Sequence, residues 1–314
     1  MKIVFPDSST MGDIPFDCIA CLGDLVLYDR STRQEALERV RDCEILIVNK
    51  VVVDDELLDA APLVKCVCEA ATGMNNIDLE ACRRRGIPVS NVAGYSTEAV
   101  VQTTFMHLLS LMCSAPYYDG FVKSGEYSKW GLFTNVSYPI YEVYGKTIGI
   151  IGMGTIGKRV AQVAEAFGMK VVYYSTSGTS HCKDYPSLPL DELMRTSDAV
   201  TIHAPLNERT RNLIGGKELS LMKPTAVIIN AGRGGIIDEA ALCDAVDGGI
   251  IAGAALDVFS KEPLPADNPL MHVKHPEKFR FTPHTAWASV EARRRLSEGI
   301  ADNIKAFLKD YKGL

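Results

Sequence analysis

The sequence lacks the features that mark several broad classes of protein. No apolar run approaches the roughly 20 residues that a transmembrane helix needs, so we expect no membrane partner. Positive charge is not in excess either: the formal net charge is −6 at pH 7, which disfavours a nucleic-acid partner. The N-terminus has no charged-then-apolar layout of a signal peptide and opens directly on a strand pattern, Lys2–Phe5. We therefore expect a cytoplasmic protein.

Metal-binding patterns are also missing. A structural zinc site needs four converging ligands, and the nine cysteines offer only two close pairs, Cys18-x-x-Cys21 and Cys66-x-Cys68. The second pair belongs to an apolar strand pattern, where small thiols pack well. The sequence thus predicts no metal site, and free thiols in a reducing compartment.

What the sequence does contain is a two-part rhythm in a chain of 314 residues, long enough for two domains. Short apolar runs alternate with helical patterns up to about residue 95, and the rhythm restarts after Gly145. Such alternation predicts parallel sheets covered by helices on both faces. The predicted strands are Ile3–Phe5, Leu25–Tyr28, Ile45–Asn49, Lys65–Glu69 and Val89–Asn91, then Thr147–Ile151, Val171–Tyr174, Ala199–His203, Ala226–Asn230, Gly253–Val258 and Arg280–Thr282.

The two halves are joined by a helical pattern, Thr97–Leu111, and by a tyrosine-rich stretch up to Tyr144 that we expect to be irregular. The last segment, Ser289–Leu308, predicts one amphipathic helix. A closing helix of that length can return to the first half. We therefore predict one domain from residues 1–96 and 289–314, with a second domain, 97–288, inserted into it.

A glycine-rich turn is the most informative motif. The apolar strand pattern Thr147–Ile151 runs into Gly152-x-Gly154-x-x-Gly157, and a helical pattern follows. Gly152 permits a tight turn, Gly154 lets a pyrophosphate approach the backbone, and Gly157 lets the helix pack closely on the sheet. Because the strand–turn–helix context is present, the motif predicts a dinucleotide site.

One element of that motif is absent. A dinucleotide-binding unit usually carries Asp or Glu about 20 residues past the glycines, to bind the adenosine ribose. This chain has Ser175-Thr176-Ser177 there, so nothing repels a 2′-phosphate, but no arginine lies in the segment to bind one. The residues favour NAD and leave NADP possible.

Three downstream residues follow predicted strands of the second half. Arg233 lies beside glycines after Val227–Ile229, Glu262 follows a strand, and His284 comes directly after Arg280–Thr282. Taken singly, each has an ordinary structural explanation. Ligands of such sheets bind at the carboxyl ends of the strands, however, and all three residues fall at that edge with the glycine turn.

Six segments together resemble one family, the D-isomer-specific 2-hydroxyacid dehydrogenases, over nearly the whole chain. They are Ala70–Asp78, Gly152–Gly157, His203–Thr210, Asn230–Gly234, Leu256–Pro263 and Thr282–Trp287. The resemblance implies an α/β fold of two doubly wound parallel-sheet domains, a flavodoxin-like substrate domain and a Rossmann dinucleotide-binding domain. It also implies an active site in the cleft between them and a homodimer.

The same resemblance assigns residue roles. It implies that Arg233, Glu262 and His284 are the catalytic triad, and that Thr72, Gly73 and Met74 form the loop for the substrate carboxylate, with Arg233 and His284 also on the substrate. The implied cofactor residues are Gly152, Gly154, Thr155, Ile156, Gly157, Ser175, His203, Ala204, Pro205, Thr210, Ala231 and Asp257, with Thr103 on the linking helix.

The chemistry of the triad follows from the reaction. Reducing a 2-oxo acid needs a hydride at the carbonyl carbon, which the nicotinamide supplies, and a proton at its oxygen. An imidazole, whose ordinary pKa lies near 6.5, suits His284 to that proton transfer. A carboxylate at Glu262 would orient the ring, and Arg233 would hold the substrate carboxylate and polarise the carbonyl.

Substrate identity remains open at this point. His284-Thr-Ala-Trp287 resembles the glycerate dehydrogenase (hydroxypyruvate reductase) branch, which favours a small polar 2-oxo acid such as hydroxypyruvate or glyoxylate. D-lactate dehydrogenase activity, or activity on a bulkier 2-hydroxy acid, is an alternative. An alternative of another class is a nucleotide-sensing, corepressor-like binding protein, which would need an exposed apolar groove.

Overall fold

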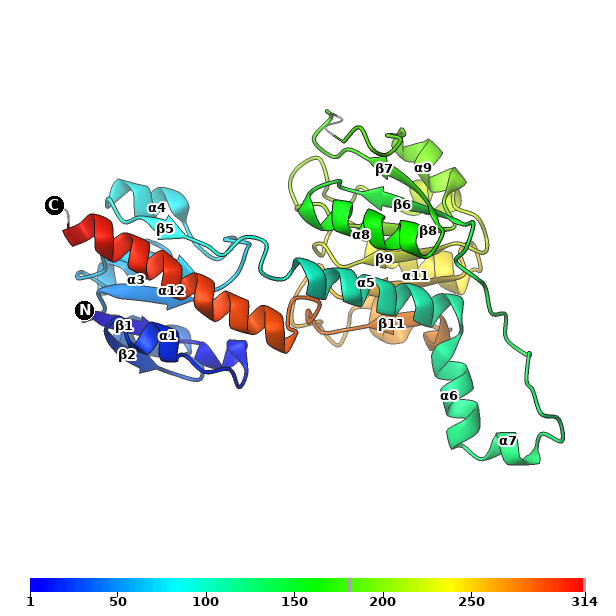
Figure 1. Ribbon diagram of the computed structural model, residues 1–314, viewed down its shortest axis with the longest axis horizontal. Coiled ribbons are helices and arrows are strands. Elements are labelled where there is room, and N and C mark those ends of the chain that lie inside the picture. Colours follow the sequence, from blue (N-terminus) through cyan, green and yellow to red (C-terminus); the bar gives the residue numbers. More distant parts are fainter. Residues whose placement is uncertain (180–181, 313–314) are drawn as a thin grey trace. The chain divides into compact units, whose positions relative to one another are not determined.

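The protein, as a computed structural model, is described at residues 1–179 and 182–312 and is an α/β structure with two sheets (Figure 1). The chain divides into two compact units: unit 1 comprises Met1–Ser96 with Trp287–Leu314, and unit 2 comprises Thr97–Ala286. All strand pairs of both sheets in these residues are parallel. The prediction of two doubly wound parallel sheets is confirmed.

Unit 1 has a five-stranded sheet in the order β2-β1-β3-β4-β5, which is the flavodoxin-like order. Its strands are β1 (Lys2–Phe5), β2 (Asp24–Leu27), β3 (Ile45–Val48), β4 (Cys66–Glu69) and β5 (Val89–Ser90). Its helices are η1 (Ser8–Met11), α1 (Asp17–Ala20), α2 (Arg33–Arg39), α3 (Asp55–Ala60), α4 (Leu79–Arg84) and α12 (Val290–Lys312).

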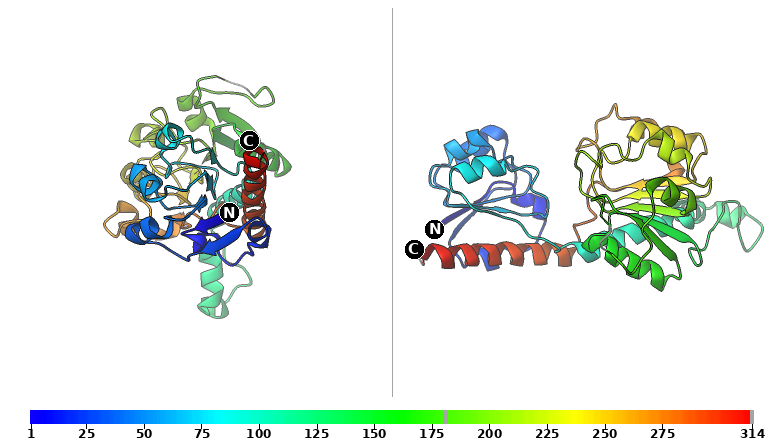
Figure 2. Two further views of the ribbon diagram at one scale, coloured as in Figure 1. Left: turned by 90° about the vertical axis from the view of Figure 1, so that its left-hand side faces the viewer. Right: turned by 90° about the horizontal axis from the view of Figure 1, so that it is seen from above.

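The central strands of unit 1, β1, β3 and β4, are buried on both faces, as in all-parallel sheets covered by helices. Val4, Leu46 and Val67 point to one face and form a core with side chains of α2, α3 and α4. On the other face α12 contacts β4 and α1, and the right-hand view of Figure 2 shows α12, in red, across the sheet from α3 and α4. Ile300 and Ile304 of α12 are fully buried, so the predicted amphipathic helix buries its apolar face.

Unit 2 has a six-stranded sheet in the order β11-β10-β9-β8-β6-β7. Its strands are β6 (Thr147–Ile151), β7 (Lys170–Tyr174), β8 (Ala199–Ile202), β9 (Val227–Asn230), β10 (Gly253–Leu256) and β11 (Phe279–Phe281). A single parallel bridge joins Tyr173 to Ser187 beside β7. If that bridge is counted as a rudimentary third strand, the order begins 3-2-1-4-5-6, as in the Rossmann fold.

The helices of unit 2 are α5 (Thr97–Met112), α6 (Ala115–Lys123), α7 (Glu126–Lys129), α8 (Thr155–Ala166), α9 (Leu190–Thr196), α10 (Gly216–Ser220), α11 (Glu239–Asp247), η2 (Pro269–His272) and η3 (Pro276–Lys278). Apart from α6 and α7, they cover both faces of its sheet. Successive residues of β9 point to opposite faces: Val227 and Ile229 pack with α5 and α8, whereas Ile228 packs with α9, α10 and α11.

The expectation of an irregular stretch up to Tyr144 was wrong in part. Residues 115–129 form α6 and α7, which extend away from the sheet of unit 2 in Figure 1. Neither helix buries a side chain, so the sequence has no core-facing apolar period there to reveal them.

Two further findings concern partners. Over residues 1–179 and 182–312, no helix combines the length and apolar character needed to cross a bilayer. In the same residues, no group of three or more His, Cys, Asp or Glu side chains is arranged to hold a metal ion. All nine cysteines are free thiols.

Candidate active site

The carboxyl ends of the unit 2 strands bring most of the candidate residues to one edge. The register aligns Ile151 of β6 with Ile202 of β8, Ile202 with Asn230 of β9, Asn230 with Leu256 of β10, and Leu256 with Phe281 of β11. The residues that follow these strands include Gly152, His203, Ala231, Asp257 and Thr282. In parallel sheets this edge is where ligands bind.

The glycine turn has the shape that a pyrophosphate needs. Gly152 has φ +95°, and a Cβ there would lie 2.7 Å from the His203 carbonyl oxygen. A Cβ at Gly157 would lie 2.2 Å from the Gly152 carbonyl oxygen, so the turn and helix touch backbone to backbone. Gly154, the N-cap of α8, faces open space, with no atom of the described residues within 4 Å of a Cβ built on it.

Thr155 and Ile156 follow as the first residues of α8, whose N-terminus carries unpaired N–H groups and the positive end of the helix dipole. Ile156 packs on a small cluster of Val100, Ala231 and Ala286, which fixes the helix start against the end of β9. An open Gly154 in front of this helix N-terminus fits a dinucleotide phosphate.

His284 and Glu262 form a direct pair. The Nδ1 atom of His284 lies 2.6 Å from Oε2 of Glu262, and the backbone N–H of Phe259 donates to Oε1 of Glu262 (3.0 Å). Both side chains remain about a third exposed, 31% for His284 and 34% for Glu262. Within the described residues, Nε2 of His284 has no hydrogen-bond partner. The carboxylate therefore fixes the Nδ1–H tautomer or the imidazolium, and leaves Nε2 for proton exchange with a ligand.

Asp257 anchors the segment that carries His284. This side chain is 1% exposed, and its carboxylate accepts hydrogen bonds from the Thr282 hydroxyl (2.6 Å) and from the backbone N–H groups of Thr285 (2.9 Å) and Ala286 (3.0 Å). The backbone N–H of His284 donates to the Asp257 carbonyl oxygen (2.8 Å). These bonds hold His284 at φ +54°, a left-handed conformation that few residues adopt without support.

His107 extends this anchor, although no sequence motif singles it out. Its Nε2 lies 3.1 Å from the Thr282 hydroxyl oxygen, which already donates its only proton to Asp257, so His107 must donate here. Burial lowers the pKa of His107, which favours the neutral ring. His107 lies on α5, so a helix that is far from this loop in the sequence supports the loop after β11.

Arg233 lies close to the same segment through its neighbouring backbone. A Cβ at Gly234 would lie 1.7 Å from the Phe259 carbonyl oxygen, so only glycine permits this contact. The Asn230 side chain binds the Arg233 carbonyl oxygen (2.9 Å). The Arg233 guanidinium donates to the Gly232 carbonyl oxygen (2.8 Å) and makes no ion pair with any carboxylate of the described residues. Its remaining donors suit a carboxylate ligand.

His203 contributes a buried polar atom. Its Nε2 lies 2.9 Å from the Thr201 hydroxyl, while Nδ1 is buried and has no partner in residues 1–179 and 182–312. Burial lowers the pKa of His203 to about 4, so the ring is neutral at pH 7. An unpaired buried nitrogen beside the glycine turn can accept a ligand's hydrogen bond or, as the other tautomer, donate one.

The other cofactor candidates differ in exposure. Ala204 is buried and Pro205 is exposed, whereas Thr210 is fully buried and its hydroxyl donates to the Pro205 carbonyl oxygen (2.7 Å), which closes the turn between them. Thr103 is half-buried on α5, and Ser175 is half-buried after β7.

Thr72, Gly73 and Met74 belong to unit 1, where they follow β4. The Thr72 hydroxyl donates to the Val92 carbonyl oxygen (3.0 Å), and the Asn91 side chain donates to the Thr72 carbonyl oxygen (2.6 Å). At the far end of this loop the Asn76 side chain donates to the Val51 carbonyl oxygen (3.1 Å) and to Glu69 (3.0 Å). The loop is thus tied at both ends.

Comparison with known proteins places these features in a family. Residues 105–286 match the NAD-binding domain of the D-isomer-specific 2-hydroxyacid dehydrogenases. A hydroxypyruvate reductase of Blautia hydrogenotrophica is 34% identical, covering 98% of this chain and 97% of its own. A glyoxylate reductase of Korarchaeum cryptofilum is 38% identical (88% and 83% covered), and a glycerate dehydrogenase of Methylorubrum extorquens is 37% identical (88% and 86%).

Solved structures agree. An NADPH-dependent glyoxylate/hydroxypyruvate reductase from Sinorhizobium meliloti, in complex with NADP and malonate, superposes with a TM-score of 0.82 at 29% identity, covering 98% of this chain and 93% of that one. A D-lactate dehydrogenase from Aquifex aeolicus, complexed with NAD and lactic acid, gives 0.84 at 28% identity, with 98% and 96% covered.

Proposed function

Because the chain belongs to the D-isomer-specific 2-hydroxyacid dehydrogenase family, we propose that it reduces a small 2-oxo acid to the D-2-hydroxy acid with NADH or NADPH. Hydroxypyruvate and glyoxylate are the favoured substrates, because relatives that align over most of the chain are named hydroxypyruvate reductase and glyoxylate reductase. The 2.6 Å pair of His284 with Glu262, with Nε2 left open, is the observation that carries the proposal.

In this proposal the chain's own residues bind the substrate and move one proton. The Arg233 guanidinium pairs with the substrate carboxylate, and its positive charge stabilises the negative charge that develops on the carbonyl oxygen. His284 transfers the proton from Nε2 to that oxygen, while Glu262 holds Nδ1 and stabilises the charged ring. When bound, the nicotinamide supplies the hydride for the carbonyl carbon.

The two units divide these tasks. We assign the cofactor to residues 97–288, where the open Gly154, the helix N-terminus of α8 and the unpaired His203 Nδ1 fit a dinucleotide. Asp257 then serves chiefly to hold the His284 segment, with one carboxylate oxygen carrying a single protein hydrogen bond. Residues 1–96 and 289–314 form the substrate domain, and the Thr72–Met74 loop binds the substrate carboxylate.

A panel of 2-oxo acids assayed with NADH and NADPH tests the proposal. We expect the highest kcat/KM with hydroxypyruvate or glyoxylate. Phosphorylated acids should react poorly, because Met74-Asn75-Asn76 brings no cation to the loop. A preference for pyruvate or for bulky acids would favour the alternative D-lactate or D-2-hydroxyacid dehydrogenase activity. Nucleotide binding without any turnover would favour a corepressor-like binding protein instead.

We also propose that the protein is a cytoplasmic homodimer. Its nine free thiols suit a reducing compartment. The arm formed by residues 115–140 exposes large apolar side chains that a monomer rarely leaves in water: Val122 57%, Leu132 65%, Phe133 90%, Val136 79% and Ile140 58%. A twofold contact between two copies of this arm would cover them. Sedimentation should give a dimer, and the double substitution Phe133→Ser, Val136→Ser should give a monomer, unlike the control Val52→Ser.

A further inference from the structure

The first residues after β7 lie next to the glycine turn. Tyr174, the last residue of β7, pairs with Ile151 of β6, and the Gly152 N–H donates to the Tyr174 carbonyl oxygen (3.0 Å). Ser175 is therefore adjacent to the turn that fits the phosphates. In a dinucleotide-binding unit the adenosine ribose lies here, and its 2′-substituent meets the residues at the end of this strand.

Hydroxyl groups gather at this position in place of a carboxylate. The Oγ atoms of Ser175 and Ser177 are 3.1 Å apart, and both donate to the Thr179 carbonyl oxygen, at 2.6 and 3.1 Å. Residues 170–179 contain no Asp or Glu. No carboxylate of the segment therefore accepts a hydrogen bond from a ribose 2′-hydroxyl, and none repels a phosphate.

The sequence showed no arginine in this segment, but the fold supplies one from elsewhere. Arg209 lies in the loop after β8, and its Nη1 donates to the Ser177 carbonyl oxygen (2.9 Å). Because β6 lies between β8 and β7 in the sheet, the Arg209 side chain spans the end of β6 to reach this point. The guanidinium is exposed and pairs with no carboxylate in the described parts of the chain.

We propose that Arg209, Ser175 and Ser177 form a binding site for the 2′-phosphate of NADP, so that the protein prefers NADPH to NADH. A guanidinium binds a phosphomonoester through two parallel charge-assisted hydrogen bonds, and the two hydroxyls add donors when they turn from Thr179. The inference rests on the proposed function only in that the glycine turn must bind a dinucleotide.

Two nucleotides that differ only in the phosphate of interest provide the test, without any turnover. Calorimetric titration should show tighter binding of adenosine 2′,5′-bisphosphate than of adenosine 5′-monophosphate. In Arg209→Ala we expect the bisphosphate to lose about 10- to 100-fold in affinity and the monophosphate less than about threefold, as for the loss of a charge-assisted hydrogen bond. Arg209→Lys should recover part of the loss, and Ser175→Asp should abolish the discrimination.

The matched control is Arg195→Ala, which removes an exposed arginine of α9 and the same charge. It should leave both affinities unchanged. The ratio of kcat/KM for NADPH to that for NADH should fall in Arg209→Ala in parallel with the bisphosphate affinity.

Any one of the following results would overturn the site. Equal affinities of the unmodified protein for the two nucleotides would mean that no group recognises the 2′-phosphate. An equal loss of affinity for both nucleotides in Arg209→Ala would mean that Arg209 contacts the adenosine 5′-phosphate that they share. Turnover of 2-oxo acids with NADH preferred would defeat this inference alone, whereas failure to bind either nucleotide would also defeat the proposed function.

Discussion

Each of the two sheets has a buried carboxyl group at its carboxyl edge. The two groups differ in how many hydrogen bonds they accept from the protein in place of water. In unit 2, Asp257 is 1% exposed and accepts three hydrogen bonds from the segment 282–286. In unit 1, Glu69 is fully buried, yet it accepts a single hydrogen bond, from Asn76. Its Oε1 and the neighbouring Asn49 Oδ1 have no partner among the described residues.

This difference separates a fixed anchor from a group whose charge depends on pH. Three donors offset the loss of water around Asp257, so this carboxylate can hold the His284 segment in place. Burial raises the pKa of Glu69 to about 8, although the hydrogen bond from Asn76 lowers it in part. Glu69 is then a neutral acid at pH 7, at the start of the loop that carries Thr72–Met74.

The largest expected effect comes from removing the His284 imidazole at the edge of unit 2 while leaving the Asp257 anchor intact. His284→Asn keeps a residue type that tolerates φ +54° but removes the imidazole. We expect kcat with hydroxypyruvate to fall at least about 100-fold, the usual contribution of a general acid. The melting temperature should stay close to that of the unmodified protein. His272→Asn, an exposed histidine of η2, is the control, and an unchanged kcat would remove His284 from the mechanism.

The next largest effect is expected from a change in the anchor itself, Asp257. Asp257→Asn places an amide among three donors that need an acceptor, so at least one buried donor or amide N–H loses its partner. We expect the free energy of unfolding to fall by about 2–3 kcal/mol, the cost of such an unpaired group. Urea denaturation measures this against Asp244→Asn, which changes an exposed carboxylate of α11. Equal stability of the two variants would mean that Asp257 is not an anchor.

Much of this edge could be predicted from the sequence, because strands and their ends follow local patterns. Gly152, His203, Asp257 and Thr282 each come just after an apolar run, and parallel strands align those positions whatever the loops between them. The pairing of His284 with Glu262 was expected on family resemblance, and the structure brings the two together at 2.6 Å. Their catalytic roles stay predictions.

What could not be predicted depends on contacts between side chains far apart in the sequence. His107 and Thr282 are 175 positions apart, and no spacing rule connects a residue in the middle of α5 to the loop after β11. Arg209 likewise reaches Ser177 from 32 positions away. The burial of Glu69 could not be predicted either, because a carboxylate at the end of a strand is expected to be solvated unless the packing of the loops is known.

Glu69→Gln tests the contrast between Glu69 and Asp257 through the pH dependence of the free energy of unfolding. The folded state binds the Glu69 proton more tightly than the unfolded state, whose pKa lies near the ordinary 4.5. The contribution of Glu69 to the free energy of unfolding should therefore be fully present below about pH 4.5 and should fall as the pH rises toward 8. It falls because, in this range, the folded protein retains a proton that the unfolded chain has lost. Urea denaturation from pH 5 to 9 should show stability falling by up to about 1.4 kcal/mol per pH unit between pH 5 and 8 because of this group, a fall that Gln, always neutral, abolishes.

Other buried groups near Glu69 titrate in the same direction, which sets the control. Burial raises the pKa of Asp7, and the backbone N–H groups of residues 49–51 lower it only in part. Asp7 is present in both proteins, so its contribution cancels in the difference. Glu80→Gln, at an exposed carboxylate of α4, should keep the full pH dependence. Parallel curves for Glu69→Gln and the unmodified protein would show that Glu69 is charged when folded.

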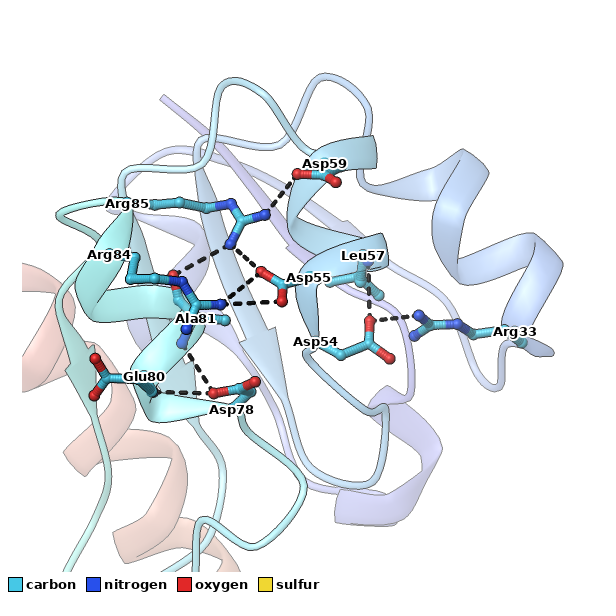
Figure 3. A network of polar contacts seen from close by, with 10 residues as sticks. All are labelled: Arg33, Asp54, Asp55, Leu57, Asp59, Asp78, Glu80, Ala81, Arg84 and Arg85. Atoms are coloured by element: carbon cyan, nitrogen blue, oxygen red, sulfur yellow. Dashed lines mark hydrogen bonds and ion pairs between the residues drawn. The ribbon is translucent and has the colours of Figure 1, made fainter.

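The smallest effect comes from a carboxylate that has more partners than Glu69 but lies in water. In Figure 3, Asp55 of α3 faces Arg84 and Arg85 at the end of α4, and Arg85 also pairs with Asp59. The Asp55 side chain is 55% exposed and that of Arg84 51%, so solvent and salt screen each pair. Asp55→Asn should leave the urea midpoint within error, at low and at high salt. A shift as large as that of Asp257→Asn would mean that the number of partners, rather than burial, decides what a carboxylate contributes in this protein.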